Sequence, residues 1–218
     1  ILNSPSLIFL LYQRGTHARF DGIALIGLLT YISVVSSCIL VGTVCNVSRK
    51  IESDLAIVLK SLSHFNEVRV FLVESDSSDS TLEVLESIKA KNSKFEYTSL
   101  GTLRTRIPDR IERIRTSRNR YVRFIRDLKI EDLPDYVIVA DLDGMNGKLT
   151  KNAVQSCFTR FDWDAVFANQ SGGYYDILAL RHDIWQPTDY NLELNWYRSL
   201  VIPKRAGYPS FYESLRLR

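Results

Sequence analysis

Cysteine, histidine, glycine and proline are all scarce in this chain of 218 residues, and each shortage excludes a class of protein. The three cysteines have neither an even count nor a CxxC spacing, so we expect reduced thiols rather than a disulfide framework. The three histidines stand far apart, without the spacing of metal ligands. Ten glycines and six prolines are too few for a collagen-like or low-complexity chain. What remains is a globular composition, 45% hydrophobic and 24% charged, long enough for one sizeable core or two small ones.

Charge is missing from Gly22 to Ser48, and this run is long enough for a transmembrane helix. Serine, threonine and asparagine crowd its second half, and the stretch 39–44 is rich in β-branched residues, which favours a buried strand. We therefore predict a hydrophobic helix over 20–35 followed by a strand over 38–45, the better of two interpretations that periodicity alone leaves ambiguous. Membrane association of this segment stays open, and the expected location is cytoplasmic or peripheral to a membrane.

Beyond residue 38, apolar stretches typical of strands alternate with amphipathic helical patterns. Strands are predicted at 38–45, 68–73, 95–99, 136–140 and 164–168. Helices are predicted at 52–65, from Leu82 through Ile88, at 108–128 and at 149–161. This alternation implies crossover connections, and hence an α/β fold with a mostly parallel sheet and helices on both faces. We expect an N-terminal extension (1–37), an α/β domain (38–188) and the start of a further region (189–218), and we expect the chain to be a fragment.

Acidic and amide side chains follow three of the predicted strands: Asn46, Glu74 with Asp76, and Asp141 with Asp143. Because ligands of open parallel sheets bind outside the carboxyl ends of the strands, we expect the chemistry there. Asp141 and Asp143 stand one residue apart at the end of a buried strand, where their repulsion is tolerable if a divalent cation and a phosphate neutralise them. The alternative is that one of them only caps the next turn, since Asp-Gly is a common turn dipeptide.

Two further stretches bear on the site. The run from Glu74 to Thr81 offers carboxylates to a ribose or a base, or else is only the capping sequence of the next helix. Nine arginines and two acids fall between Arg104 and Arg126, a segment whose charge exceeds the net +3 of the chain, so the remainder is acidic. A basic segment in a chain that is otherwise mildly acidic indicates a local anionic ligand, and guanidinium groups bind a diphosphate by paired hydrogen bonds. Most of these arginines are expected to face water or to pair with acids.

The order of these motifs resembles the GT-A glycosyltransferases. The features that carry the likeness are the apolar strand ending near Asn46, the Asp141-Leu142-Asp143 motif, and the Glu74–Thr81 run, which is similar to the Asp-Asp-Gly-Ser-x-Asp-Gly-Thr run of many sugar transferases. A narrower likeness, to transferases related to the fungal capsule-associated mannosyltransferases, is carried by Arg113-Ile114, Arg118-Asn119, Ala168-Asn169-Gln170 and the stretch Tyr174–Arg181. The likeness covers roughly residues 38–187.

The resemblance implies a metal-dependent hexosyltransferase that moves a sugar from a nucleotide-diphospho-sugar donor to a hydroxyl of a glycan, lipid or other acceptor. It implies that Mn²⁺ or Mg²⁺ is held by Asp141 and Asp143, with Asp141 also near the ribose or a metal-bound water. The further substrate-binding residues expected are Asn46, Glu74, Asp76, Arg118 and Asn119. Asp176 is the candidate catalytic group at the sugar or acceptor, unless it is a strand-end carboxylate that pairs with Arg181.

Departures from the family pattern limit what carries over. Ser75, Asp76 and Ser80 replace residues of the usual run, so the nucleoside contacts do not transfer one for one. The acceptor region expected after the resembling stretch is not apparent in 189–218, which again indicates truncation.

Two other interpretations stay open. The basic segment 104–126 suits a non-catalytic module that binds polyanions or nucleic acid, whereas the enzymatic interpretation expects no nucleic-acid partner. A sugar-nucleotidyltransferase is the third interpretation, and the lack of a Gly-rich phosphate loop near the first predicted strand counts against it.

Overall fold

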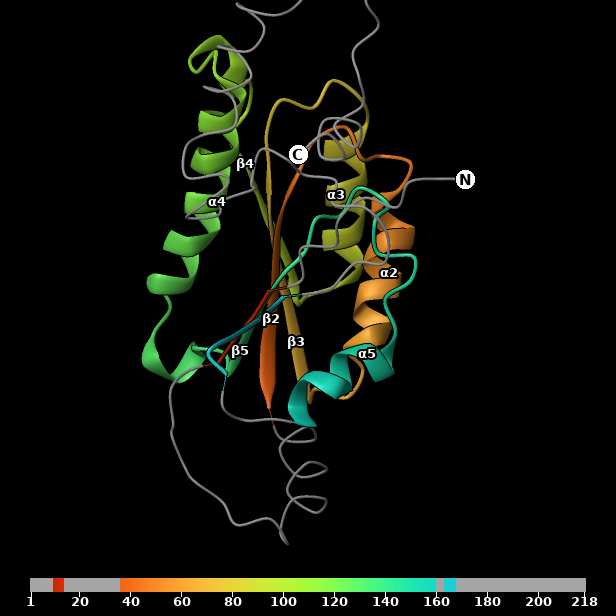
Figure 1. Ribbon diagram of the computed structural model, residues 1–218. Helices are drawn as coiled ribbons and strands as arrows, with labels where there is room; N and C mark the ends of the chain where they lie inside the picture. The colour runs from red at the N-terminus through yellow and green to blue at the C-terminus, as the bar shows by residue number, and fades with distance from the viewer. Residues whose placement is uncertain (1–9, 14–35, 160–162, 168–218) are drawn as a thin grey trace, which may run out of the picture. The chain divides into compact units, whose positions relative to one another are not determined.

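The structure of the chain is a computed structural model that describes residues 10–13, 36–159 and 163–167 (Figure 1). The chain divides into two compact units, 1–171 and 172–218, and every described residue belongs to the first. The helix predicted at 20–35 and the region 189–218 lie outside the described residues, so the expected three-part division stays a prediction. In the described part of the chain, no helix has the length and apolar character needed to cross a membrane.

A six-stranded sheet in the order β4-β3-β2-β5-β1-β6 forms the centre of the first unit. The strands are β1 (Leu10–Gln13), β2 (Ser37–Val44), β3 (Glu67–Glu74), β4 (Phe95–Ser99), β5 (Tyr136–Val139) and β6 (Ala165–Phe167). β4, β3, β2 and β5 run parallel, whereas β1 is antiparallel to both β5 and β6. The predicted α/β fold with a mostly parallel sheet is thus confirmed, and β1 is a strand that the sequence pattern did not indicate.

Helices cover both faces of the parallel strands, as predicted (Figure 1). The cores assign α2 (Ile51–Ser61), α3 (Thr81–Lys91) and α5 (Lys151–Ser156) to one face, and α4 (Arg110–Arg126) to the other. Helix α5 is shorter than the helix predicted at 149–161. Thr150 is its N-cap and accepts a hydrogen bond from the Ala153 backbone N–H at 3.1 Å, so α5 begins only after it, and a 3₁₀ turn follows at Cys157–Thr159.

Successive side chains of β2 point to opposite faces of the sheet, and apolar side chains on both faces need helices to cover them. Cys38 and Leu40 join the core beneath α2, Ile39 and Val41 join the core beneath α4, and none of the four is more than 1% exposed. A strand buried on both faces needs the nearly continuous apolar sequence that β2 has.

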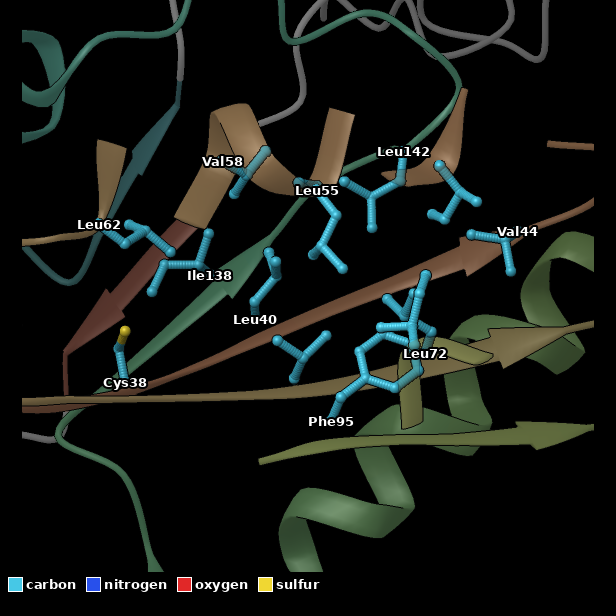
Figure 2. Packing of buried hydrophobic residues seen from close by; sticks show 14 of the residues in the cluster. Cys38, Leu40, Val44, Leu55, Val58, Leu62, Leu72, Phe95, Ile138 and Leu142 are labelled. Atoms are coloured by element: carbon cyan, nitrogen blue, oxygen red, sulfur yellow. The ribbon is translucent and has the colours of Figure 1, made fainter. Parts of the chain in front are cut away.

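Each helix contributes the apolar residues of one of its sides to these cores. Leu55 and Val58 of α2 and Leu62, the residue directly after it, point toward the sheet, where Ile138 of β5 lies beneath them (Figure 2). On the opposite face, Phe124 of α4 stacks on Phe71 of β3 with 3.7 Å between ring centroids. The two cores fix the helices against the strands and therefore fix the loops between them.

The strand order creates a switch point between β2 and β5. The chain moves outward from β2 to β3 to β4, and it then returns to the other side of β2 to form β5. The registers pair Val44 with Glu74 and Glu74 with Ser99, so the parallel strands end together at one edge of the sheet. Crevices at such an edge, where the winding direction reverses, are where open α/β sheets bind ligands.

Candidate functional site

A cavity of about 400 Å³ lies at this switch point. Its wall contains Cys45 after β2, Ser75 and Asp76 after β3, and Asp141 and Asp143 after β5. The first half of α4 forms another part of the wall. Residues that follow three different strands therefore meet at one cavity, and of the residues expected there Asp76, Asp141 and Asp143 are in its wall, whereas Asn46 and Glu74 are not.

The charged lining of the cavity carries both signs. The cations are Arg104, Arg110, Arg113 and Arg118, and the anions are Asp76, Asp141 and Asp143. Guanidinium groups bind phosphate oxygens by paired hydrogen bonds, and carboxylates bind hard cations. The arrangement suits a phosphorylated ligand that arrives with a divalent cation.

The arginines of α4 reach the cavity because of where the helix starts. Asp109 is the N-cap, and its side chain accepts a hydrogen bond from the Glu112 backbone N–H at 2.8 Å. From that start, Arg110, Arg113 and Arg118 fall within one half of the helix circumference, and all three line the cavity. Asn119, the next residue, is exposed and is not part of the lining, so its role in substrate binding stays a prediction.

Asp76 holds two of the arginines in place. It adopts a left-handed backbone conformation (φ 62°), and its Oδ1 accepts hydrogen bonds from the Arg104 backbone N–H at 2.8 Å and from Arg104 Nε at 3.4 Å. Its Oδ2 lies 3.3 Å from Nε of Arg113. Both carboxylate oxygens of Asp76 thus face guanidinium groups of the cavity, which makes Asp76 a scaffold for those arginines. Its predicted contact with the nucleoside is untested.

Glu74 is 1% exposed and is not in the wall of the cavity. One oxygen accepts a hydrogen bond from the Ser77 backbone N–H at 2.9 Å, and the other accepts one from the hydroxyl of Ser99. These bonds tie the loop after β3 to the end of β4. Contact of Glu74 with a substrate stays a prediction.

Asn46 lies beside a second cavity, of about 420 Å³, that is lined also by Arg49, Lys50 and Asp79. Its backbone is left-handed (φ 54°), and its Oδ1 accepts a hydrogen bond from the Ser78 backbone N–H at 2.7 Å. Asn46 therefore joins the loops after β2 and β3 and is not in the wall of the first cavity. Its predicted part in substrate binding is untested, and Asp176 lies outside the described residues.

The turn after β5 carries Asp141 and Asp143. Partial burial raises the pKa of the Asp143 carboxyl above its ordinary value, and the nearby charge of Asp54 raises it further, whereas its own backbone N–H and Lys50 lower it. Lys50 also donates a hydrogen bond to the backbone oxygen of Asp143 at 3.0 Å. Gly144 follows in the left-handed region (φ 95°), which glycine adopts without strain.

A buried carboxylate that the sequence analysis missed holds this turn. Asp54, in the first turn of α2, accepts hydrogen bonds from the backbone N–H groups of Gly144 at 3.1 Å and Asn146 at 3.2 Å. The side-chain amide of Asn146 donates to Asp54 at 2.7 Å and to the backbone oxygen of Asp141 at 2.7 Å. One signal for it was present, because Asp54 stands three residues after Ile51, on the apolar side of the helix, where an acid is out of place.

The described residues offer few ligands for the metal that the sequence predicts. Within the residues that the structure describes, no group of three or more Asp, Glu, His and Cys side chains is placed to hold an ion. Asp141 and Asp143 are two carboxylates in one cavity wall with arginines nearby. Mg²⁺ characteristically takes one or two carboxylates and completes its shell with water and phosphate, so the residues present fit an ion that binds together with a diphosphate.

No protein-family model matches the chain, and no curated protein matches it either.

Proposed function

We propose that the α/β domain is the donor-binding part of a metal-dependent glycosyltransferase of GT-A type, which uses a nucleotide-diphospho-sugar. One observation carries the proposal: Asp141 and Asp143 share a cavity at the switch point with four arginines. A pair of acids that served only as turn caps would need no such neighbours. The resemblance of the motif order to GT-A enzymes supports the same function.

The arginines supply the affinity for the diphosphate. Arg104 and Arg113 are pre-oriented by Asp76, so little side-chain entropy is lost when phosphate oxygens bind them. Arg110 adds positive charge from the first turn of α4, where the positive end of the helix dipole lies, and Arg118 adds positive charge from the middle of the same helix. Together they stabilise the negative charge that develops on the departing nucleoside diphosphate, and such electrostatic stabilisation is usually the largest catalytic contribution.

Asp141 and Asp143 would hold the divalent cation. When bound, the cation supplies charge neutralisation at the diphosphate. The chain's own residues keep these two carboxylates at the cavity and keep the arginines facing them. In the proposed transfer an acceptor hydroxyl attacks the anomeric carbon of the donor, the bond from this carbon to the diphosphate oxygen breaks, and the nucleoside diphosphate leaves while the hydroxyl proton passes to solvent. Asp176 is the proposed polar group at the sugar or the acceptor.

The decisive experiment measures binding of UDP and GDP by titration calorimetry, with Mn²⁺ and with EDTA. We expect binding only with Mn²⁺, and we expect Asp143→Ala to weaken it by at least about tenfold. Asp135→Ala is the matched control, because Asp135 also accepts hydrogen bonds from a backbone N–H, that of Ser37, but lies at the opposite end of β2. Metal-independent binding that survives Asp143→Ala would contradict the proposal.

A polyanion-binding module is the second candidate, favoured by the exposed arginines of α4. Arg115, Arg123 and Arg126 are exposed and are not in the cavity wall. The two functions differ in which arginine matters. A transferase loses nucleotide affinity with Arg118→Ala and keeps it with Arg123→Ala, whereas a polyanion binder loses heparin affinity with either variant, shows a steep salt dependence, and is indifferent to Asp143→Ala.

A further inference from the structure

Asp54 is a buried charge with an unusual set of partners. It is 1% exposed, and among the described residues no lysine or arginine forms a salt bridge with it. A buried carboxylate without a counter-ion is costly unless hydrogen bonds stabilise it. The three donors that do so here all belong to Gly144 and Asn146.

These bonds hold the turn at two points. The backbone N–H of Gly144 binds Asp54 directly after Asp143, and the amide of Asn146 links Asp54 to the backbone oxygen of Asp141. The turn lies close against α2, since a Cβ at Gly144 would lie 3.0 Å from Cδ of Lys50. The positions of both cavity carboxylates are therefore fixed by a side chain of another element.

We infer that Asp54 is a positioning residue, which acts through Asn146 to fix the Asp141–Asp143 turn for binding of a divalent cation and diphosphate. The inference rests on the proposed function. A turn ordered in advance binds its ligand without the entropic cost of ordering, and groups behind metal ligands commonly tune affinity in this way. The negative charge of Asp54 also favours a cation at the turn.

A contribution to stability alone does not account for this network. Well-packed apolar residues commonly stabilise a core as well as a buried polar network does. Asn146 is 0% exposed, and its Oδ1 has no hydrogen-bond partner among the described residues, and a polar atom left unsatisfied in the interior destabilises the folded state. The unsatisfied Oδ1 of Asn146 lowers the stability of the folded chain, whereas its amide group fixes the geometry of the Asp141–Asp143 turn.

The test compares Asp54→Asn with Asp135→Asn, which removes the charge of a carboxylate that accepts a backbone N–H far from the turn. Free Mn²⁺ is measured by electron paramagnetic resonance in the presence of GDP or UDP. We expect Asp54→Asn to raise the Kd for Mn²⁺ by about 10–100-fold and Asp135→Asn to change it by less than about twofold. Without metal or nucleotide, amide hydrogen exchange at 141–147 is expected to accelerate in Asp54→Asn only.

Asn146→Ala provides a second variant, which decides the question if Asp54→Asn does not fold. It keeps the bond from Gly144 to Asp54 and removes the link to Asp141. The expected result is again a weaker Mn²⁺ complex by about tenfold or more. Faster exchange of the turn with an unchanged Kd would show a purely structural role and overturn the inference. Wild-type protein that binds no Mn²⁺ overturns both this inference and the proposed function, whereas wild-type binding with unaffected variants overturns the inference alone.

Discussion

Gly42→Ala tests whether β2 and β5 approach each other as closely as the site requires. Gly42 pairs with Leu72 of β3, and a Cβ built on it would lie 2.3 Å from the backbone oxygen of Ala140. Overpacking a well-filled core costs about 1–3 kcal/mol. Because the contacted atom belongs to the backbone and cannot swing away, we expect the upper part of this range, about 2–3 kcal/mol.

The measurement is equilibrium unfolding in urea, followed by circular dichroism. For a small domain the free energy of unfolding falls by about 1–3 kcal/mol per molar urea, so a loss of about 2–3 kcal/mol should lower the midpoint of Gly42→Ala by about 0.7–3 M. Ala140 directly precedes Asp141, so nucleotide binding with Mn²⁺ should weaken in the same variant. Gly147→Ala is the control, since a Cβ at Gly147 meets no atom within 4 Å and its midpoint should stay close to that of the wild type. Equal midpoints for the two variants would refute the reasoning.

Two further predictions concern α4 and the core beneath α2. Asp109→Ala removes the N-cap of α4 and should lower the free energy of unfolding by about 1 kcal/mol, measured in urea, whereas Asp127→Ala at the other end of the helix should be neutral or slightly stabilising; equal losses would contradict the capping role. Burial and, to a smaller extent, the charge of Lys151 lower the pKa of His64 below its ordinary 6.5. The histidine is therefore protonated at a higher pH in the unfolded chain than in the folded one, so the free energy of unfolding should fall as the pH drops below about 6.5. His64→Phe should flatten this pH dependence of the urea midpoint, and an unchanged slope would be evidence against the buried neutral histidine.

Local patterns in the sequence were enough to predict the central strands and helices. The run Phe95–Ser99 was predicted with the bounds that β4 has, because its limits are set by neighbouring residues. β1 was missed since four residues carry no periodicity of their own, and the strand exists through pairing with Tyr136–Val139, far away in the chain.

The site was predictable in its location but not in its internal contacts. The acids after β5 met the residues after β2 and β3 because the ends of parallel strands converge whatever their sequence. The hydrogen-bond partners of Glu74 and Asp76 depend on loop conformations, and such contacts join residues distant in sequence. Asp54 illustrates the limit, because its partners follow it by about ninety residues, beyond the reach of any local pattern.

The pairing of β1 with β5 and β6 also bears on how the chain is assembled on the ribosome. Among the described strands β1 is made first, yet β5 and β6, its neighbours in the sheet, are made after β2, β3 and β4. Until residues 136–139 emerge, the backbone groups of β1 have no native partner, and such late, non-local closure slows folding and exposes strand edges to wrong partners. A nascent chain stalled before residue 136 would therefore present the segment 10–13 to chaperones or to other chains.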